Sequence, residues 1–219
     1  MNRVRNILFD LDGTLTDSRE GIVNAILHSV SRMNLVEHNP EALVSFIGPP
    51  LKESFIQRYR LTEAEAKKAL AFYREYYADQ GKFENKIYHG IRELLHALND
   101  MGQMLFMATS KPTLFSRQIA EHFSIDKYFK DIVGSNLDHT RTGKSEIIRH
   151  ILEKHQLDAS ETVMIGDRAH DLTGARKCGV GSVAVSYGFG DPEEFTGLGA
   201  LFTASDVNEL KSKLLQLIR

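Results

Sequence analysis

Ile7-Leu8-Phe9-Asp10-Leu11-Asp12-Gly13-Thr14-Leu15-Thr16-Asp17 is the stretch that decides the fold of this 219-residue chain. The apolar residues from Val4 to Phe9 predict a strand, and two carboxylates follow at its end. Side chains two positions apart in an extended chain point to the same face, so we expect Asp10 and Asp12 to share one. Gly13 then lets the backbone turn away. A single aspartate here could be a turn residue, but the Asp-x-Asp pair followed by Gly-Thr indicates chemistry.

The composition restricts the possible partners. Lysine and arginine total 27 against 29 acidic residues, and the net charge of -2 offers no broad basic surface for nucleic acid. The chain shows no signal peptide and no long apolar span, so we expect neither secretion nor a membrane partner. Cys178 is the single cysteine and cannot form an internal disulfide, so we expect a reducing, cytoplasmic protein in which Cys178 packs rather than reacts.

The region from residue 17 to residue 85 has helical periodicity and no convincing strand. Expected helices span 17–35, 41–46, 51–59 and 62–79. The first could begin at Asp17, three residues before Glu20 in a capping arrangement, or at Ser18. We therefore expect residues 17–85 to form an inserted helical domain.

After residue 85, short apolar runs alternate with helical patterns. Expected strands are 104–108, 131–134, 162–165 and 182–185, and expected helices are 90–101, 113–122, 144–155, 169–177 and 205–218. This alternation predicts βαβ units, and hence an α/β fold with a doubly wound, Rossmann-like parallel sheet. Residues 1–16 and 86–219 would form this core domain.

Four groups that are distant in the sequence follow the predicted strands or begin the next helix. Because ligands of such sheets bind beyond the carboxyl ends of the strands, we expect these groups to meet. Each also has an ordinary alternative as a helix cap, a first-turn residue or an exposed lysine. The groups are Asp10 with Asp12, Thr109 with Ser110, Lys144, and Asp167 with Asp171.

Taken together and in this order, the four groups strongly resemble the four motifs of the haloacid dehalogenase superfamily of phosphatases. Asp10-Leu11-Asp12-Gly13-Thr14 resembles the first motif, Thr109-Ser110 the second, Lys144 the third, and Gly166-Asp167 through Asp171 the fourth. The resemblance covers the whole chain, and the helical insert is similar to the family's helical cap.

The resemblance implies a mechanism and a cofactor. Asp10 would attack phosphorus and form an aspartyl-phosphate, while Asp12 would act first as an acid and then as a base. Mg²⁺ would be held by Asp10, the main-chain carbonyl of Asp12, Asp167 and Asp171. Thr109 and Lys144, with amides near Gly13 and Ser110, would bind the transferring oxygens.

The substrate is less constrained than the reaction. The turn 46–51, with Gly48 and Pro49, resembles the cap loop of phosphoglycolate phosphatase-like members and would contact substrate, although it could be an ordinary helix break. Arg19, Lys52 and Arg58 are candidate contacts to a second anionic group, or merely solvated cations.

We thus expect a magnesium-dependent phosphatase of a small phosphorylated metabolite, with phosphoglycolate first. Alternatives are a 5'-nucleotidase acting on nucleoside monophosphates, a phosphomutase, and a non-catalytic phospholigand-binding protein. The sequence leaves open whether the protein is a monomer or a homodimer.

Overall fold

The computed structural model describes residues 3–137 and 140–218. The chain divides into two compact units: Met1–Thr16 with Ile87–Arg219, called here the sheet unit, and Asp17–Lys86, called the helical unit. The chain passes between the units at two short strands, β2 (Thr16–Asp17) and β3 (Lys86–Ile87), which pair with each other. None of the helices among the described residues has both the length and the apolarity needed to cross a bilayer.

The sheet unit is built on a parallel sheet in the order β5-β4-β1-β6-β7-β8. These strands are β1 (Asn6–Phe9), β4 (Met104–Pro112), β5 (Asp131–Ser135), β6 (Thr162–Gly166), β7 (Gly181–Val185) and β8 (Thr203–Ala204). The predicted α/β class and parallel sheet are confirmed. Strands β2, β3 and β8 were missed because two residues are too short to produce a periodic pattern.

The register of the central strands fixes the place of the site. Phe9 at the end of β1 pairs with Met107 of β4 on one side and with Ile165 of β6 on the other. The residues that follow these three positions therefore emerge at one edge of the sheet. Four-residue β1 is fully buried, as expected for a strand covered on both faces.

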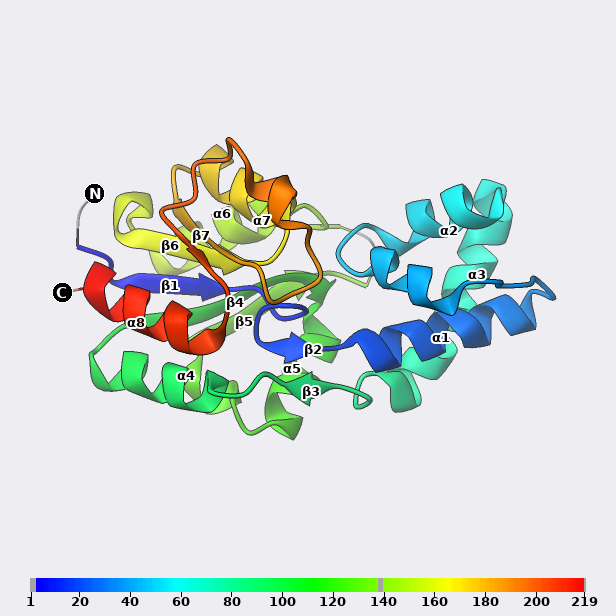
Figure 1. Cartoon of the computed structure of the whole chain (residues 1–219), viewed down its shortest axis with the longest axis horizontal. Coiled ribbons are helices and arrows are strands. Elements are labelled where there is room, and N and C mark those ends of the chain that lie inside the picture. Colours follow the sequence, from blue (N-terminus) through cyan, green and yellow to red (C-terminus); the bar gives the residue numbers. More distant parts are fainter. Residues whose placement is uncertain (1–2, 138–139, 219) are drawn as a thin grey trace. The chain divides into compact units, whose positions relative to one another are not determined.

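Helices cover both faces of this sheet (Figure 1). Helices α4 (Ile91–Asp100), α5 (Thr113–His122) and α8 (Val207–Leu217) pack on one face, and α6 (Lys144–His155) and α7 (Ala169–Lys177) on the other. The predicted bounds of α5, α6 and α7 are confirmed. Three short 3-10 helices complete the connections: η3 (Asp126–Tyr128), η4 (Ala159–Glu161) and η5 (Pro192–Phe195).

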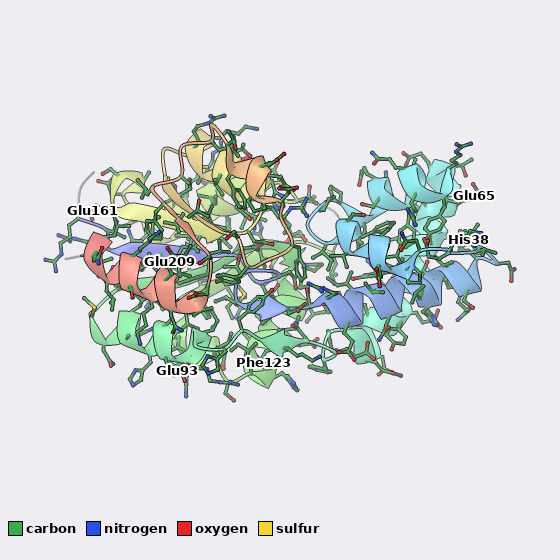
Figure 2. The ribbon with its side chains drawn as sticks, viewed as in Figure 1. His38, Glu65, Glu93, Phe123, Glu161 and Glu209 are labelled. Carbon is green, nitrogen blue, oxygen red and sulfur yellow. The ribbon has the colours of Figure 1, made fainter. Side chains whose placement is uncertain are left out.

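The helical unit contains three α-helices and two shorter helical turns. They are α1 (Arg19–Arg32), the 3-10 helix η1 (Pro40–Phe46), α2 (Leu51–Tyr59), α3 (Glu63–Tyr76) and the π-helix η2 (Tyr77–Gly81). Glu65, labelled in Figure 2, closes the start of α3, because its carboxylate accepts hydrogen bonds from the amide and the hydroxyl of Thr62. At α1, Asp17 accepts the amide of Arg19 at 3.1 Å.

The predicted helix over residues 62–79 ends earlier, at Tyr76, and continues as the π-helical turn. A close backbone approach explains this change. A Cβ on Gly21 would lie 1.8 Å from the carbonyl oxygen of Gly81, and the amide of Gly21 donates to the carbonyl of Glu84 at 2.9 Å. The local pattern of residues could not show this long-range contact.

Candidate active site

Lys144 lies between two buried carboxylates at the edge of the sheet. Its Nζ atom is 2.9 Å from Oδ1 of Asp10, which directly follows β1, and 2.7 Å from Oδ1 of Asp171 in the first turn of α7. It also donates a hydrogen bond to the carbonyl of Ala108 at 2.9 Å. All three charged side chains are almost completely buried. The structure thus brings together three residues that the sequence places far apart.

The charges in this cluster stabilise one another. Burial alone would lower the pKa of Lys144, but the carboxylates of Asp10 and Asp171 outweigh it and raise that pKa above its ordinary value. Burial would likewise raise the pKa of Asp171, and the nearby Lys144 ammonium lowers it instead. The second oxygen of Asp171 accepts the amide of Arg168 at 3.0 Å, so this residue both caps α7 and faces the cluster.

Asp167 directly follows β6. Its negative charge is the least compensated by hydrogen bonds and cations among the acidic groups of this cluster. Its Oδ2 atom accepts the amide of Phe189 at 2.7 Å, while its buried Oδ1 atom has no hydrogen-bond partner in the described structure. Burial, with the charges of Asp171 and Asp10, raises the pKa of Asp167 well above its ordinary value. A buried, unsatisfied carboxylate oxygen is costly unless something positive binds it.

A divalent cation fits this place. Asp10, Asp167 and Asp171 each offer a carboxylate oxygen, and the three oxygens lie within 4.8 Å of one another. Hard oxygen ligands of this kind suit Mg²⁺ or a similar ion. The side chain of Asp12 is not part of this group of oxygens.

The side chain of Asp12 instead pairs with Lys111. Nζ of Lys111 lies 2.7 Å from Oδ1 of Asp12, and both side chains are largely buried. Lys111 could not be singled out by a motif of its own, although this residue follows Thr109 and Ser110 at the same strand end. Its position at this strand end was the feature of the sequence that could have indicated a role for Lys111. Strand β4 was expected to end at Ala108 but continues to Pro112, and this extension carries Lys111 to Asp12.

The groups expected to bind phosphoryl oxygens lie at this edge too. Thr109 is buried, and its hydroxyl oxygen accepts the amide of Lys111 at 3.3 Å. The amide of Gly13 donates to the carbonyl of Thr16 at 2.8 Å, so it already has a partner. Among the described residues, the amides of Leu11 and Asp12 make no hydrogen bond. They are the amide donors next to Asp10 that the sequence analysis did not name.

Gly13 has a further structural role. It has a φ of 80°, and a Cβ there would lie 2.1 Å from Oδ2 of Asp167 and 2.9 Å from the ring of Phe189. Only glycine permits this approach between the loop after β1 and the acidic group after β6.

The substrate contacts expected from the insert belong to the helical unit. Gly48, with a φ of 106°, and Pro49 lie between η1 and α2, and their role stays a prediction. Lys52 and Arg58 are engaged within that unit, by Glu63 at 2.8 Å and by Glu37 at 2.6 Å. Arg19 lines a pocket of about 650 Å³ in the same unit.

Residues 7–185 match the model of the haloacid dehalogenase-like hydrolases. A 5'-nucleotidase from Pseudomonas aeruginosa is 47% identical over 97% of this chain and 96% of its own length. The crystal structure of a predicted phosphatase from Clostridium acetobutylicum superimposes with a TM-score of 0.93 at 44% identity, covering 98% of this chain and all of that one. The chain therefore belongs to the haloacid dehalogenase-like hydrolases, and it is a phosphatase.

Other relatives have different names. A phosphoglycolate phosphatase from Vibrio parahaemolyticus is 28% identical over 94% of both chains. The tyrosine-protein kinase PtkA from Mycobacterium tuberculosis is 33% identical over 95% of this chain and 72% of its own length. The proteins that are similar to this chain thus include ones named as phosphatases and one named as a kinase.

Proposed function

We propose that this protein is a magnesium-dependent phosphatase that hydrolyses nucleoside 5'-monophosphates through an aspartyl-phosphate on Asp10. The observation that carries the proposal is the buried cluster in which Lys144 pairs with Asp10 and Asp171, while one oxygen of Asp167 has no hydrogen-bond partner among the described residues. This arrangement offers a nucleophile held in one orientation beside a place for a cation.

Each side chain of the site has a different role in the proposed reaction. Lys144 fixes the carboxylate of Asp10 for attack on phosphorus. Asp12, whose Oδ1 atom is held by Lys111, gives the proton of its carboxyl group to the leaving oxygen and then, as a carboxylate, accepts one from water. Thr109, Ser110 and the amides of Leu11 and Asp12, which donate no hydrogen bond among the described residues, supply donors for the phosphoryl oxygens.

The cation would be held by the carboxylates of Asp10, Asp167 and Asp171 and by the main-chain carbonyl of Asp12. When bound, Mg²⁺ supplies the positive charge that offsets the repulsion between a carboxylate and a phosphate dianion.

The sequence identities of the relatives support a ranking of the candidate substrates. The sequence motifs alone favour phosphoglycolate, but the relative named 5'-nucleotidase is far more similar to this chain than the one named phosphoglycolate phosphatase, at 47% against 28% identity. We therefore place nucleoside monophosphates first. Phosphoglycolate is the second candidate, and the turn containing Gly48 and Pro49 is the feature that favours it.

Phosphate release with a panel of nucleoside 5'-monophosphates, phosphoglycolate and sugar phosphates tests the proposal. We expect magnesium-dependent release that is fastest with a nucleoside monophosphate, and near-complete loss in Asp10→Asn, which keeps the size of the side chain. Equal rates in the two proteins would remove Asp10 as nucleophile. Interconversion of sugar-phosphate isomers with little phosphate release would instead identify a mutase.

A further inference from the structure

Tyr187 ties the end of the sheet to the loop that carries the nucleophile. Its hydroxyl donates a hydrogen bond at 2.9 Å to the main-chain carbonyl of Thr14, which lies 173 residues earlier. Its ring packs edge-on against Tyr88, with centroids 5.0 Å apart. The amide of Tyr88 in turn donates to the carbonyl of Leu15 at 3.1 Å. Two consecutive carbonyls of the loop are thus held by one pair of packed tyrosines.

The residues that follow Tyr187 hold Asp167. The amide of Phe189 donates to Oδ2 of Asp167 at 2.7 Å. A Cβ on Gly188 would lie 2.3 Å from the carbonyl oxygen of Gly13 and 2.5 Å from Cβ of Asp167. A Cβ on Gly190 would lie 1.9 Å from the carbonyl oxygen of Asp167. Glycines at these two positions let the segment lie directly against both parts of the site.

We propose that Tyr187–Gly190 is a positioning segment that holds the loop after Asp10 and the carboxylate of Asp167 in fixed positions relative to each other. It contacts Thr14 through a side chain and Asp167 through a main-chain amide. The hydrogen bond to Oδ2 leaves Oδ1 as the oxygen without a hydrogen-bond partner among the described residues. The inference rests on the proposed function, because it gives the segment the role of aligning Asp10, Asp12 and Asp167, the acidic groups that the proposed reaction uses.

A carboxylate that rotates freely can present either oxygen, and a hydrogen bond to one of the two oxygens removes this choice. The loop after β1 is a tight turn in which the amides of Leu15 and Thr16 donate to the carbonyl of Leu11 at 2.9 and 3.0 Å. A hydrogen bond at Thr14 therefore restrains the whole turn and, through it, the direction of Asp10 and Asp12.

The test is Tyr187→Phe, which removes one oxygen and keeps the ring packed against Tyr88. We expect kcat for p-nitrophenyl phosphate to fall about fivefold, the factor that corresponds to one hydrogen bond, with KM changed less than twofold. The Mg²⁺ midpoint of a calorimetric titration should increase about tenfold. Tyr128→Phe is the matched control, since the Tyr128 hydroxyl makes no hydrogen bond among the described residues.

Gly188→Ala adds a second, direct perturbation of Asp167. We expect it to weaken the Mg²⁺-induced rise in Tm more than Tyr187→Phe does. If Tyr187→Phe lowers Tm but leaves kcat and the Mg²⁺ midpoint at their wild-type values, the hydrogen bond is only structural and the inference is overturned. If the wild type hydrolyses none of the phosphomonoesters, the proposed function fails, while the Mg²⁺ midpoint still decides the positioning role.

Discussion

The ammonium nitrogen of Lys111 and Oδ1 of Asp12 lie 2.7 Å apart, although 99 residues separate them in the sequence. The exposed fractions of the two side chains are only 6% and 15%. A buried charge-assisted hydrogen bond of this length holds a carboxylate in one direction. Asp12 is proposed to give a proton to the leaving oxygen. Lys111 therefore sets the direction from which that proton is given.

Replacing Lys111 should therefore affect turnover more than binding. We expect Lys111→Met to lower kcat about tenfold or more, because Asp12 loses its orientation. Lys111→Arg should recover part of the loss by restoring the cation. Steady-state kinetics with p-nitrophenyl phosphate would measure both, and a wild-type kcat in Lys111→Met would contradict the assignment.

Lys144 is expected to matter for stability as well as activity. Lys144→Met leaves Asp10 and Asp171 buried without their cation, which costs about 3 to 5 kcal/mol in comparable buried pairs. Urea unfolding should show this loss. The exposed pair of Lys213 with Glu209, 2.8 Å apart, is the control, and Lys213→Met should cost less than about 1 kcal/mol. Similar losses for both variants would show that the buried cluster is not stabilising.

Gly13→Ala should inactivate the enzyme through a steric clash with Asp167. Gly102 offers a matched control, because its φ of 76° is similar but a Cβ there would meet no atom within 4 Å. Both substitutions impose the same backbone strain, roughly 1 kcal/mol. Activity should fall about a hundredfold only in Gly13→Ala. Equal activities in the two variants would mean that the close approach does not matter.

Metal binding should strengthen as the pH rises. Burial, with Asp171 and Asp10, raises the pKa of Asp167, so a proton competes with the cation for this carboxylate more strongly than it does at an ordinary aspartate. Because the pKa of Asp167 is higher in the folded than in the unfolded protein, the metal-free protein loses stability as the pH rises from the ordinary pKa of an aspartate to this raised pKa. Titrations of Mg²⁺ followed by Tm at several pH values would test this. In Asp167→Asn we expect weaker binding with a smaller dependence on pH.

Asp131 forms an ionic cluster away from the catalytic carboxylates. Burial would raise its pKa, but hydrogen bonds from Lys154 at 2.7 Å and His155 at 3.0 Å outweigh this and lower the pKa to about 2. The resulting stabilisation, about 2 kcal/mol, is present above the ordinary pKa and is lost as the pH falls towards 2.

Asp131→Asn should therefore lower the free energy of unfolding at pH 7 by about 2 kcal/mol and flatten its decline between pH 4 and pH 2. Denaturant unfolding at several pH values would measure the change. Asp126→Asn is the control. An unchanged acid dependence in Asp131→Asn would show that the cluster does not contribute.

The proposed site could be located from the sequence because its markers are local. Apolar runs define strands, and Asp10, Thr109 and Asp167 follow such runs directly. In a parallel sheet the carboxyl ends share one edge, and these residues come close together because β4, β1 and β6 are neighbours in it. The bounds of α6 and α7 were equally visible, because their apolar residues recur at helical spacing.

The sequence by itself thus determined the class of fold, the edge of the sheet at which the acidic groups gather, and the family that their motifs resemble. Only the tertiary structure decided that Lys111 holds Asp12, that Tyr187 holds the carbonyl of Thr14, and that one oxygen of Asp167 has no hydrogen-bond partner in the part of the chain that the structure describes. Each of these depends on strand register and on how far a side chain or loop extends past its strand. Such contacts are long-range, and no local pattern encodes them.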